Sequence, residues 1–228
     1  MTQGELTNTW NYFLSLENDI AATSRYIEPN GQENVFSFEF SKLIVLSCTE
    51  VESVLKTICS IVEGRECGNI GEYKEIVLKH CSKIVLAEVF IPRWGKTTRP
   101  FDGWDSGKLG WWDAYVAIKH NRESSFESAT YKNAVYALSA LYILILYLAK
   151  ICGLRIDSEK STYIISAYAF RLLAFEPEKE LPDYDTEIES LSSGTIQGTA
   201  RVYYKQTEPP EPNEGVIWFR KVDRGDAP

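Results

Sequence analysis

The sequence predicts a mainly α fold, an up-down helical bundle of four to six helices with a C-terminal extension that carries one or two short strands. Through most of residues 1–175 the apolar side chains recur at three- and four-residue spacing, the period of an amphipathic helix. From residue 176 the sequence becomes acidic and rich in Pro, with short apolar pieces typical of strands. We therefore expect a helical bundle over residues 1–175 and an acidic, Pro-containing extension over residues 176–228.

Periodic apolar spacing predicts three helices in the first part of the chain, over residues 6–27, 40–62 and 73–84. Gly64 follows the second and is its expected stop, since glycine readily adopts the left-handed conformation that ends many helices. Pro92 closes the third. His80 falls on the apolar face of that helix, where we expect a hydrogen-bonded interior histidine.

Residues 93–110, RWGKTTRPFDGWDSGKLG, show no periodicity. A structureless loop of this length is uncommon unless it is functional or mobile, and we expect one of these roles here. The loop leads directly into a helix over residues 111–122.

An apolar helix is expected over residues 128–152, ended by Gly153, with N-capping chemistry from Ser124, Ser125 and Ser128. Residues 134–149 hold no charge, so a membrane anchor is the alternative interpretation. A span needs about 20 apolar residues, whereas a helix at the centre of a bundle is also apolar all round. We interpret this segment as a buried helix.

A last helix is expected from Asp157 or Ser158, because Ile164, Tyr168 and Leu172 are four apart. In the extension, the pieces ARVYY and GVIWF predict one or two strands, paired as a hairpin across TEPPEPNEG.

Charge is distributed unevenly along the chain. The formal net charge of −8 argues against nucleic-acid binding by the whole surface. Residues 93–122 nevertheless hold six basic and three acidic residues, whereas residues 176–228 hold six basic and twelve acidic residues. The chain thus has a basic middle and an acidic tail.

Five cysteines without CxxC spacing favour reduced thiols in a cytosolic protein. The polar start, MTQGELTNTW, lacks the basic and apolar parts of a signal peptide. We expect a cytoplasmic protein that does not act at a membrane.

The run of residues 111–122, WWDAYVAIKHNR, ends an aromatic helical pattern in a cluster of cations. On a helical wheel Lys119 and Arg122 fall inside the apolar arc, and His120 lies at its edge. An amphipathic helix normally carries such charges on its opposite face. This end of the helix therefore either emerges from the core or builds a site.

Imidazole beside fixed cations suits phosphodiester chemistry, because His moves a proton while Lys and Arg hold phosphate oxygens. In RNA cleavage the 2′-hydroxyl attacks its own phosphate, so neither a protein nucleophile nor a metal is needed. The sequence contains no GxSxG, HExxH or GxxxxGK motif, and we expect no metal and no cofactor. The expected RNA- or phosphate-binding residues of the preceding loop are Arg93, Lys96, Arg99 and Lys108.

A purely structural interpretation competes with this one. Cations in the last turn of a helix complement its dipole by about 0.3–1 kcal/mol each, and Lys or Arg stems can cover apolar surface. The tryptophans of the run are then core residues.

A helical bundle with a polar motif ending in His before the last long apolar helix resembles the HEPN proteins, among them prokaryotic toxin, antiphage and CRISPR-associated ribonucleases. Their motif is an Arg, commonly followed by a polar residue, then four to six intervening residues and a His. The matching stretch is YVAIKH, with Tyr115 in place of the Arg, Val116 at the polar position and His120 as the His. Arg122 follows His120 by two residues.

The resemblance implies a metal-independent endoribonuclease of an antiphage or toxin–antitoxin system. Its site would consist of His120 as acid or base, Lys119 and Arg122 on the phosphate, and Tyr115 at the motif position. It also implies a homodimer through the motif helix. The alternative is a catalytically inactive HEPN-like module that docks on RNA or on a partner protein of a defence complex, and the missing Arg and the acidic tail favour that alternative.

Overall fold

The computed structural model of the protein describes residues 1–157, 160–162, 164–166, 201–204 and 217–220. The chain forms two compact units, Met1–Phe175 and Glu176–Pro228. The mainly α fold expected from the sequence is confirmed. The described residues contain five α-helices: α1 (Gln3–Thr23), α2 (Phe38–Glu63), α3 (Ile70–His80), α4 (Gly110–His120) and α5 (Tyr131–Ile151).

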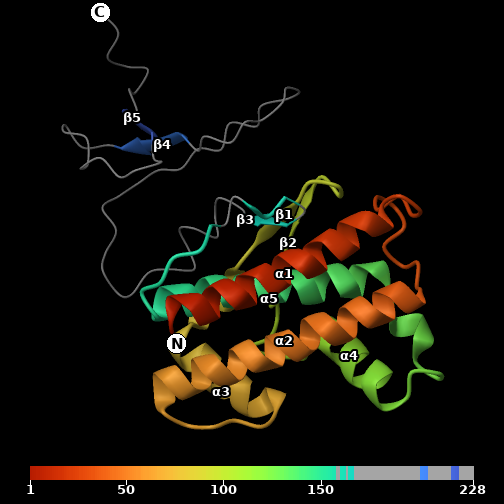
Figure 1. Cartoon of the computed structure of the whole chain (residues 1–228), viewed down its shortest axis with the longest axis horizontal. Coiled ribbons are helices and arrows are strands. Elements are labelled where there is room, and N and C mark those ends of the chain that lie inside the picture. The colour runs from red at the N-terminus through yellow and green to blue at the C-terminus, as the bar shows by residue number, and fades with distance from the viewer. Residues whose placement is uncertain (158–159, 163, 167–200, 205–216, 221–228) are drawn as a thin grey trace, which may run out of the picture. The chain divides into compact units, whose positions relative to one another are not determined.

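Helices α1 and α4 run in one direction and α2 and α5 in the other (Figure 1). The starts of α2 and α5 adjoin, because Phe36 and Thr130 form a β-bridge just ahead of them. Asp19 near the end of α1 meets Lys42 near the start of α2, so these two helices are antiparallel. This arrangement brings the C-terminal end of α4 beside the N-terminal end of α2.

Helix α5 is the centre of this bundle, and α1, α2 and α4 all pack against it. Among the described residues it is the one helix long and apolar enough to cross a membrane, and 78% of its most apolar window is buried within the protein. Its N-cap is Thr130, whose hydroxyl accepts a hydrogen bond from the N–H of Asn133 at 3.1 Å. The expected capping by Ser124, Ser125 or Ser128 is therefore wrong, and Ser128 instead lies in the short 3-10 helix η2 (Phe126–Ser128).

The segment expected to be a structureless loop is folded. Strands β1 (Val89–Ile91) and β2 (Lys96–Thr98) form an antiparallel hairpin. Its turn needs Gly95, whose φ of 63° lies in the left-handed region. Beyond β2 the chain continues through turns in which Phe101, Trp104 and Leu109 are buried. Apolar anchoring thus holds this segment against the bundle and fixes the start of α4.

A second correction concerns the helix expected after Asp157. Ile165–Ser166 form strand β3, which pairs antiparallel with β1 and completes a sheet of order β2-β1-β3. The free edge of β1 offers backbone hydrogen bonds that a helix at this position would forgo. Tyr168 and Leu172, on which the expected helix also rested, lie outside the described residues.

A buried carboxylate ties this last segment to the first helix. Glu17 of α1 is 2% exposed and accepts hydrogen bonds from the hydroxyl of Ser161 at 2.6 Å and the N–H of Ile164 at 2.8 Å. At the other end of α1, the amide of Gln3 donates to the carbonyl of Arg155 at 2.7 Å. Residues 155–164 are therefore fastened along α1.

In the extension, β4 (Arg201–Tyr204) and β5 (Ile217–Arg220) confirm the expected short strands but pair in parallel. The expected hairpin is therefore wrong, because a tight turn joins only antiparallel strands.

His80 is hydrogen-bonded, as expected, but it is exposed rather than interior. It is the last residue of α3 and is exposed, so it is not an interior histidine. Its Nε2 lies 2.6 Å from Glu63 Oε1, and the ammonium of Lys79 lies 2.6 Å from the same oxygen. These two partners lower the pKa of Glu63 to about 2, with Lys79 the larger cause. The basic end of α3 is thus neutralised by α2.

Candidate functional site

Helix α4 holds three of the predicted site residues, Tyr115, Lys119 and His120, and its aromatic face fixes it in place. The helix was expected to run to Arg122 but ends at His120, so Arg122 lies in the turn that follows. Trp111, Trp112, Tyr115 and Ile118 are buried. The Trp111 indole N–H donates to the carbonyl of Pro100 at 2.7 Å, and its ring packs edge-on against Phe101 at 6.0 Å between centroids. The helix is therefore anchored to the turns that follow β2 through Trp111, and this anchoring does not depend on Lys119 or His120.

Tyr115, which stands at the Arg position of the resembled motif, is buried and packs edge-on against Trp112 at 5.2 Å. The ammonium of Lys119 lies 5.3 Å from the Tyr115 ring centroid. Contact with the Tyr115 hydroxyl raises the pKa of Lys119. Tyr115 thus acts as a core residue that positions Lys119.

The end of α4 opens onto a groove of about 550 Å³ between α4 and the start of α2. Its lining combines cations with an apolar floor: Phe38, Ser41, Lys42, Val45, Leu46, Ile118, Lys119 and Arg122. His120 is exposed at the tip of α4 but does not line the groove. The structure therefore brings Lys119 and Arg122 together on one surface and leaves His120 beside it.

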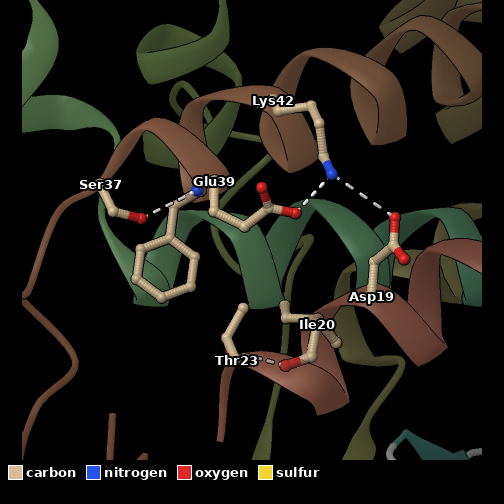
Figure 2. Close-up of polar contacts among 7 residues, drawn as sticks. Asp19, Ile20, Thr23, Ser37, Glu39 and Lys42 are labelled. Carbon is tan, nitrogen blue, oxygen red and sulfur yellow. Dashed lines mark hydrogen bonds and ion pairs between the residues drawn. The ribbon is translucent and has the colours of Figure 1, made fainter. Parts of the chain in front are cut away.

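The third cation of the groove, Lys42, differs from the other two. Figure 2 shows its ammonium between the carboxylates of Glu39 and Asp19, with 3.7 Å to Asp19 Oδ2. Contact with Glu39 raises the pKa of Lys42, so it remains protonated. Among the described residues, no carboxylate pairs with Lys119 or Arg122. Lys119 and Arg122 are thus the groove cations that no described ion pair neutralises, while Glu52 attracts Lys119 at longer range.

One exposed aromatic ring, that of Phe38 at the start of α2, lines the groove and packs against two further rings. Phe38 is 72% exposed, and its ring lies 4.6 Å from that of Phe126 between centroids. Phe36 packs edge-on against the same Phe126 at 5.4 Å. We refer to Phe36, Phe38 and Phe126 as the aromatic edge. Large rings left in water beside cations are typical of a binding surface.

The four basic residues predicted in the preceding segment do not form one surface. Arg93 pairs with Glu28 at 3.4 Å, and Arg99 is held by Glu88. Lys96 lies in β2, and its side chain is outside what the structure describes. Lys108 is exposed and lines a different cavity together with Arg99.

That cavity, of about 480 Å³, lies at the opposite end of α4. We call it the N-terminal pocket. Its lining comes from the residue before β1, from β2 and the turns after it, and from the starts of α4 and α5: Glu88, Thr97, Thr98, Arg99, Pro100, Asp102, Lys108, Leu109, Gly110, Trp111, Lys132, Asn133 and Tyr136. Apart from Arg99, Lys108 and Trp111, these residues carry no signal in the sequence, because they come from separate segments that only the folded chain brings together.

The described residues offer neither an activated thiol among Cys48, Cys59 and Cys81 nor a cluster of metal ligands. Burial raises the pKa of Cys59 to about 12 and of Cys81 to about 11, and that of Cys48 is raised well above its ordinary value. Such thiols are poor nucleophiles at neutral pH. No cluster of three or more His, Cys, Asp or Glu suited to a metal occurs within the described part of the chain.

Comparison of the chain with protein-family models, with curated proteins and with solved structures finds no match. Its function must therefore be argued from the geometry of these two surfaces.

Proposed function

We propose that this protein is a HEPN-like binding module that holds single-stranded RNA in the groove between α2 and α4. The observation that carries the proposal is the placement of two cations that no described ion pair neutralises, Lys119 and Arg122, beside the exposed ring of Phe38. Single-stranded RNA is bound by cations that neutralise phosphates and by aromatic rings that stack on unpaired bases. The groove offers both within one surface.

The chemistry of the groove favours binding over cleavage. The residue at the motif's Arg position is a buried Tyr115, which presents no cation to a phosphate. His120 lies outside the residues that line the groove. A phosphate held by Lys119 and Arg122 therefore has no proton-transfer group that the groove itself positions.

RNA affinity tests this proposal directly. In fluorescence anisotropy with a labelled single-stranded RNA, K119A/R122A should weaken binding at least about tenfold and reduce the salt slope by about 1.4, since each phosphate contact contributes about 0.7 on single strands. The matched control is K56A/K79A, which removes two cations of α2 and α3 that pair with Glu52 and Glu63. Equal losses in both variants, or no loss in the first, would refute a specific groove.

A second candidate, a metal-independent endoribonuclease, rests on one observation. His120 is exposed at the tip of α4, between the two cations in sequence. A second copy of the chain docked at this helix would bring another His120 and another pair of cations to the same place. Cleavage of RNA in a chelating buffer that H120A abolishes and H80A leaves intact would establish the enzyme, and cleavage that survives H120A would remove it.

The cellular setting is part of the same proposal. All five cysteines are free thiols, which fits a reducing cytoplasm. The homodimer and the partner of an antiphage or toxin–antitoxin operon rest on the HEPN resemblance. Sedimentation of the purified chain with and without RNA would measure the first, and co-purification with the products of neighbouring genes would test the second.

A further inference from the structure

We propose that the N-terminal pocket binds a small phosphomonoester, whose phosphate oxygens accept hydrogen bonds from the first turn of α4 and from the hydroxyl of Thr98. This site is separate from the groove that carries the proposed function, since it lies at the other end of the same helix. Its volume of about 480 Å³ falls within the range of small-molecule sites, about 300–1,000 Å³.

The start of α4 is the first element of the site. The N-cap of α4 is Leu109, which makes no side-chain capping bond, whereas α1, α2, α3 and α5 are each capped by a side chain. The N–H groups of Gly110 and Trp111 have no acceptor within the helix, and the helix dipole is positive at this end. Both residues line the pocket. A Cβ added at Gly110 would meet nothing within 4 Å, so the backbone there is open to an approaching ligand.

The second and independent element is Thr98. Only 5% of this residue is exposed, its hydroxyl has no hydrogen-bond partner within the described part of the chain, and the residue lines the same pocket. A buried hydroxyl without a partner is unfavourable, because it has lost water and gained nothing in return. A phosphate oxygen in the pocket would supply the missing acceptor.

The charges of the lining favour an anion with a single phosphate. Arg99 is neutralised by Glu88. Lys108 and Lys132 outnumber the remaining acid, Asp102, by one. The Lys132 ammonium sits 5.6 Å from the Tyr136 ring centroid, which holds it at the pocket wall. Thr97, Asn133 and Tyr136 supply neutral polar surface for the rest of the ligand.

Two variants test the site in opposite ways. T98V removes the hydroxyl while keeping the shape, and it should leave thermal stability unchanged or raised while weakening phosphate binding about tenfold. G110E places a carboxylate where the phosphate would sit, and it should abolish binding with little loss of stability, since acids are favoured in the first turn of a helix. The matched control is S47A, which removes another buried, unpartnered hydroxyl, on α2 and outside the pocket.

Calorimetric titration of the full chain with AMP and with inorganic phosphate is the measurement. The proposal expects saturable AMP binding that T98V and G110E reduce and that S47A and K119A/R122A leave unchanged. Absence of saturable AMP binding, or binding equal in wild type and both pocket variants, overturns it. A Thr98-dependent preference for RNA with a 5′-phosphate over free AMP also overturns it, because the ligand is then an RNA end. Loss of RNA binding in K119A/R122A with intact AMP binding separates this site from the groove.

Discussion

Helices α3 and α4 are a natural pair for comparison, because each has 11 residues and each ends in Lys-His. In α3 both the N–H groups of the first turn and the basic side chains of the last turn are paired with other residues of the protein. The Asn69 side chain accepts from the N–H groups of Gly71 and Glu72, at 3.0 and 3.1 Å, and Glu63 takes both Lys79 and His80. Within the described residues, α4 has neither a side-chain cap at its start nor a carboxylate at its Lys-His end.

The comparison shows that residue types alone do not make a site. Lys79-His80 and Lys119-His120 have the same chemistry, and one carboxylate on α2 decides that the first is structural. The same holds at the N-terminal ends, where an Asn in α3 fills the donors that a Leu leaves open in α4.

Helix α4 has no side-chain cap at its start, so we expect its buried aromatic residues to hold it in place. We expect W111A to lower the free energy of unfolding by about 3–5 kcal/mol, because it deletes a buried ring and its hydrogen bond to Pro100. Urea denaturation would measure this loss. A loss of unfolding free energy below about 1 kcal/mol would mean that Trp111 does not anchor α4.

A carboxylate placed in the groove should pair with the cations at the end of α4, as Glu63 pairs with Lys79 and His80 at the end of α3. Val45 is half-buried in the groove lining, and V45E would face Lys119 and Arg122. RNA affinity should fall about tenfold, or about 1.4 kcal/mol, through loss of free positive charge. The reciprocal variant E63Q frees Lys79 and His80, and we expect no RNA binding to appear there, because Glu63 ends α2 whereas the exposed ring of Phe38 lies at its start.

Removing the cap of α3 should make its start resemble that of α4. N69A leaves the N–H groups of Gly71 and Glu72 without their acceptor and should cost about 1 kcal/mol of folding stability. Thermal unfolding would detect it. If N69A were neutral, the missing cap at α4 would carry no energetic meaning.

The Lys-His end of α3 should show a pH signature that α4 lacks. The pKa of Glu63 is about 2 in the fold against 4.5 as its ordinary value, so its contribution to stability is present above about pH 4.5 and is lost as the pH falls toward 2. The difference in unfolding free energy between wild type and E63Q should therefore shrink across that window. A difference independent of pH would mean that the ion pair does not form in solution.

Most of the helical fold could be predicted from the sequence, because long amphipathic helices repeat their apolar spacing. The hairpin could not, since β1 and β2 have three residues each, too few for a period to emerge. The place of His80 was misjudged because the helix was expected to continue to residue 84, whereas it ends at His80 and leaves this side chain exposed beside Glu63.

In the candidate site, too, some residues could be predicted from the sequence and others could not. Lys119 and Arg122 stood out on a helical wheel because charge inside an apolar arc is a local signal. Phe38 and Lys42 carry no such signal, and they join the groove only because α2 and α4 are antiparallel neighbours. Thr98 is an ordinary strand residue in the sequence, and its unpartnered hydroxyl exists only in the packed structure.

The bond between Glu17 and the segment around Ser161 also sets an order of events during synthesis. The two residues are 144 positions apart, so at about 5–20 residues per second the ribosome needs about 7–29 s to deliver the partner of a carboxylate made near the start. Until then Glu17 lies on the apolar face of α1 without these hydrogen bonds, which disfavours burial of that face. We infer that the first helix to be made is among the last to settle.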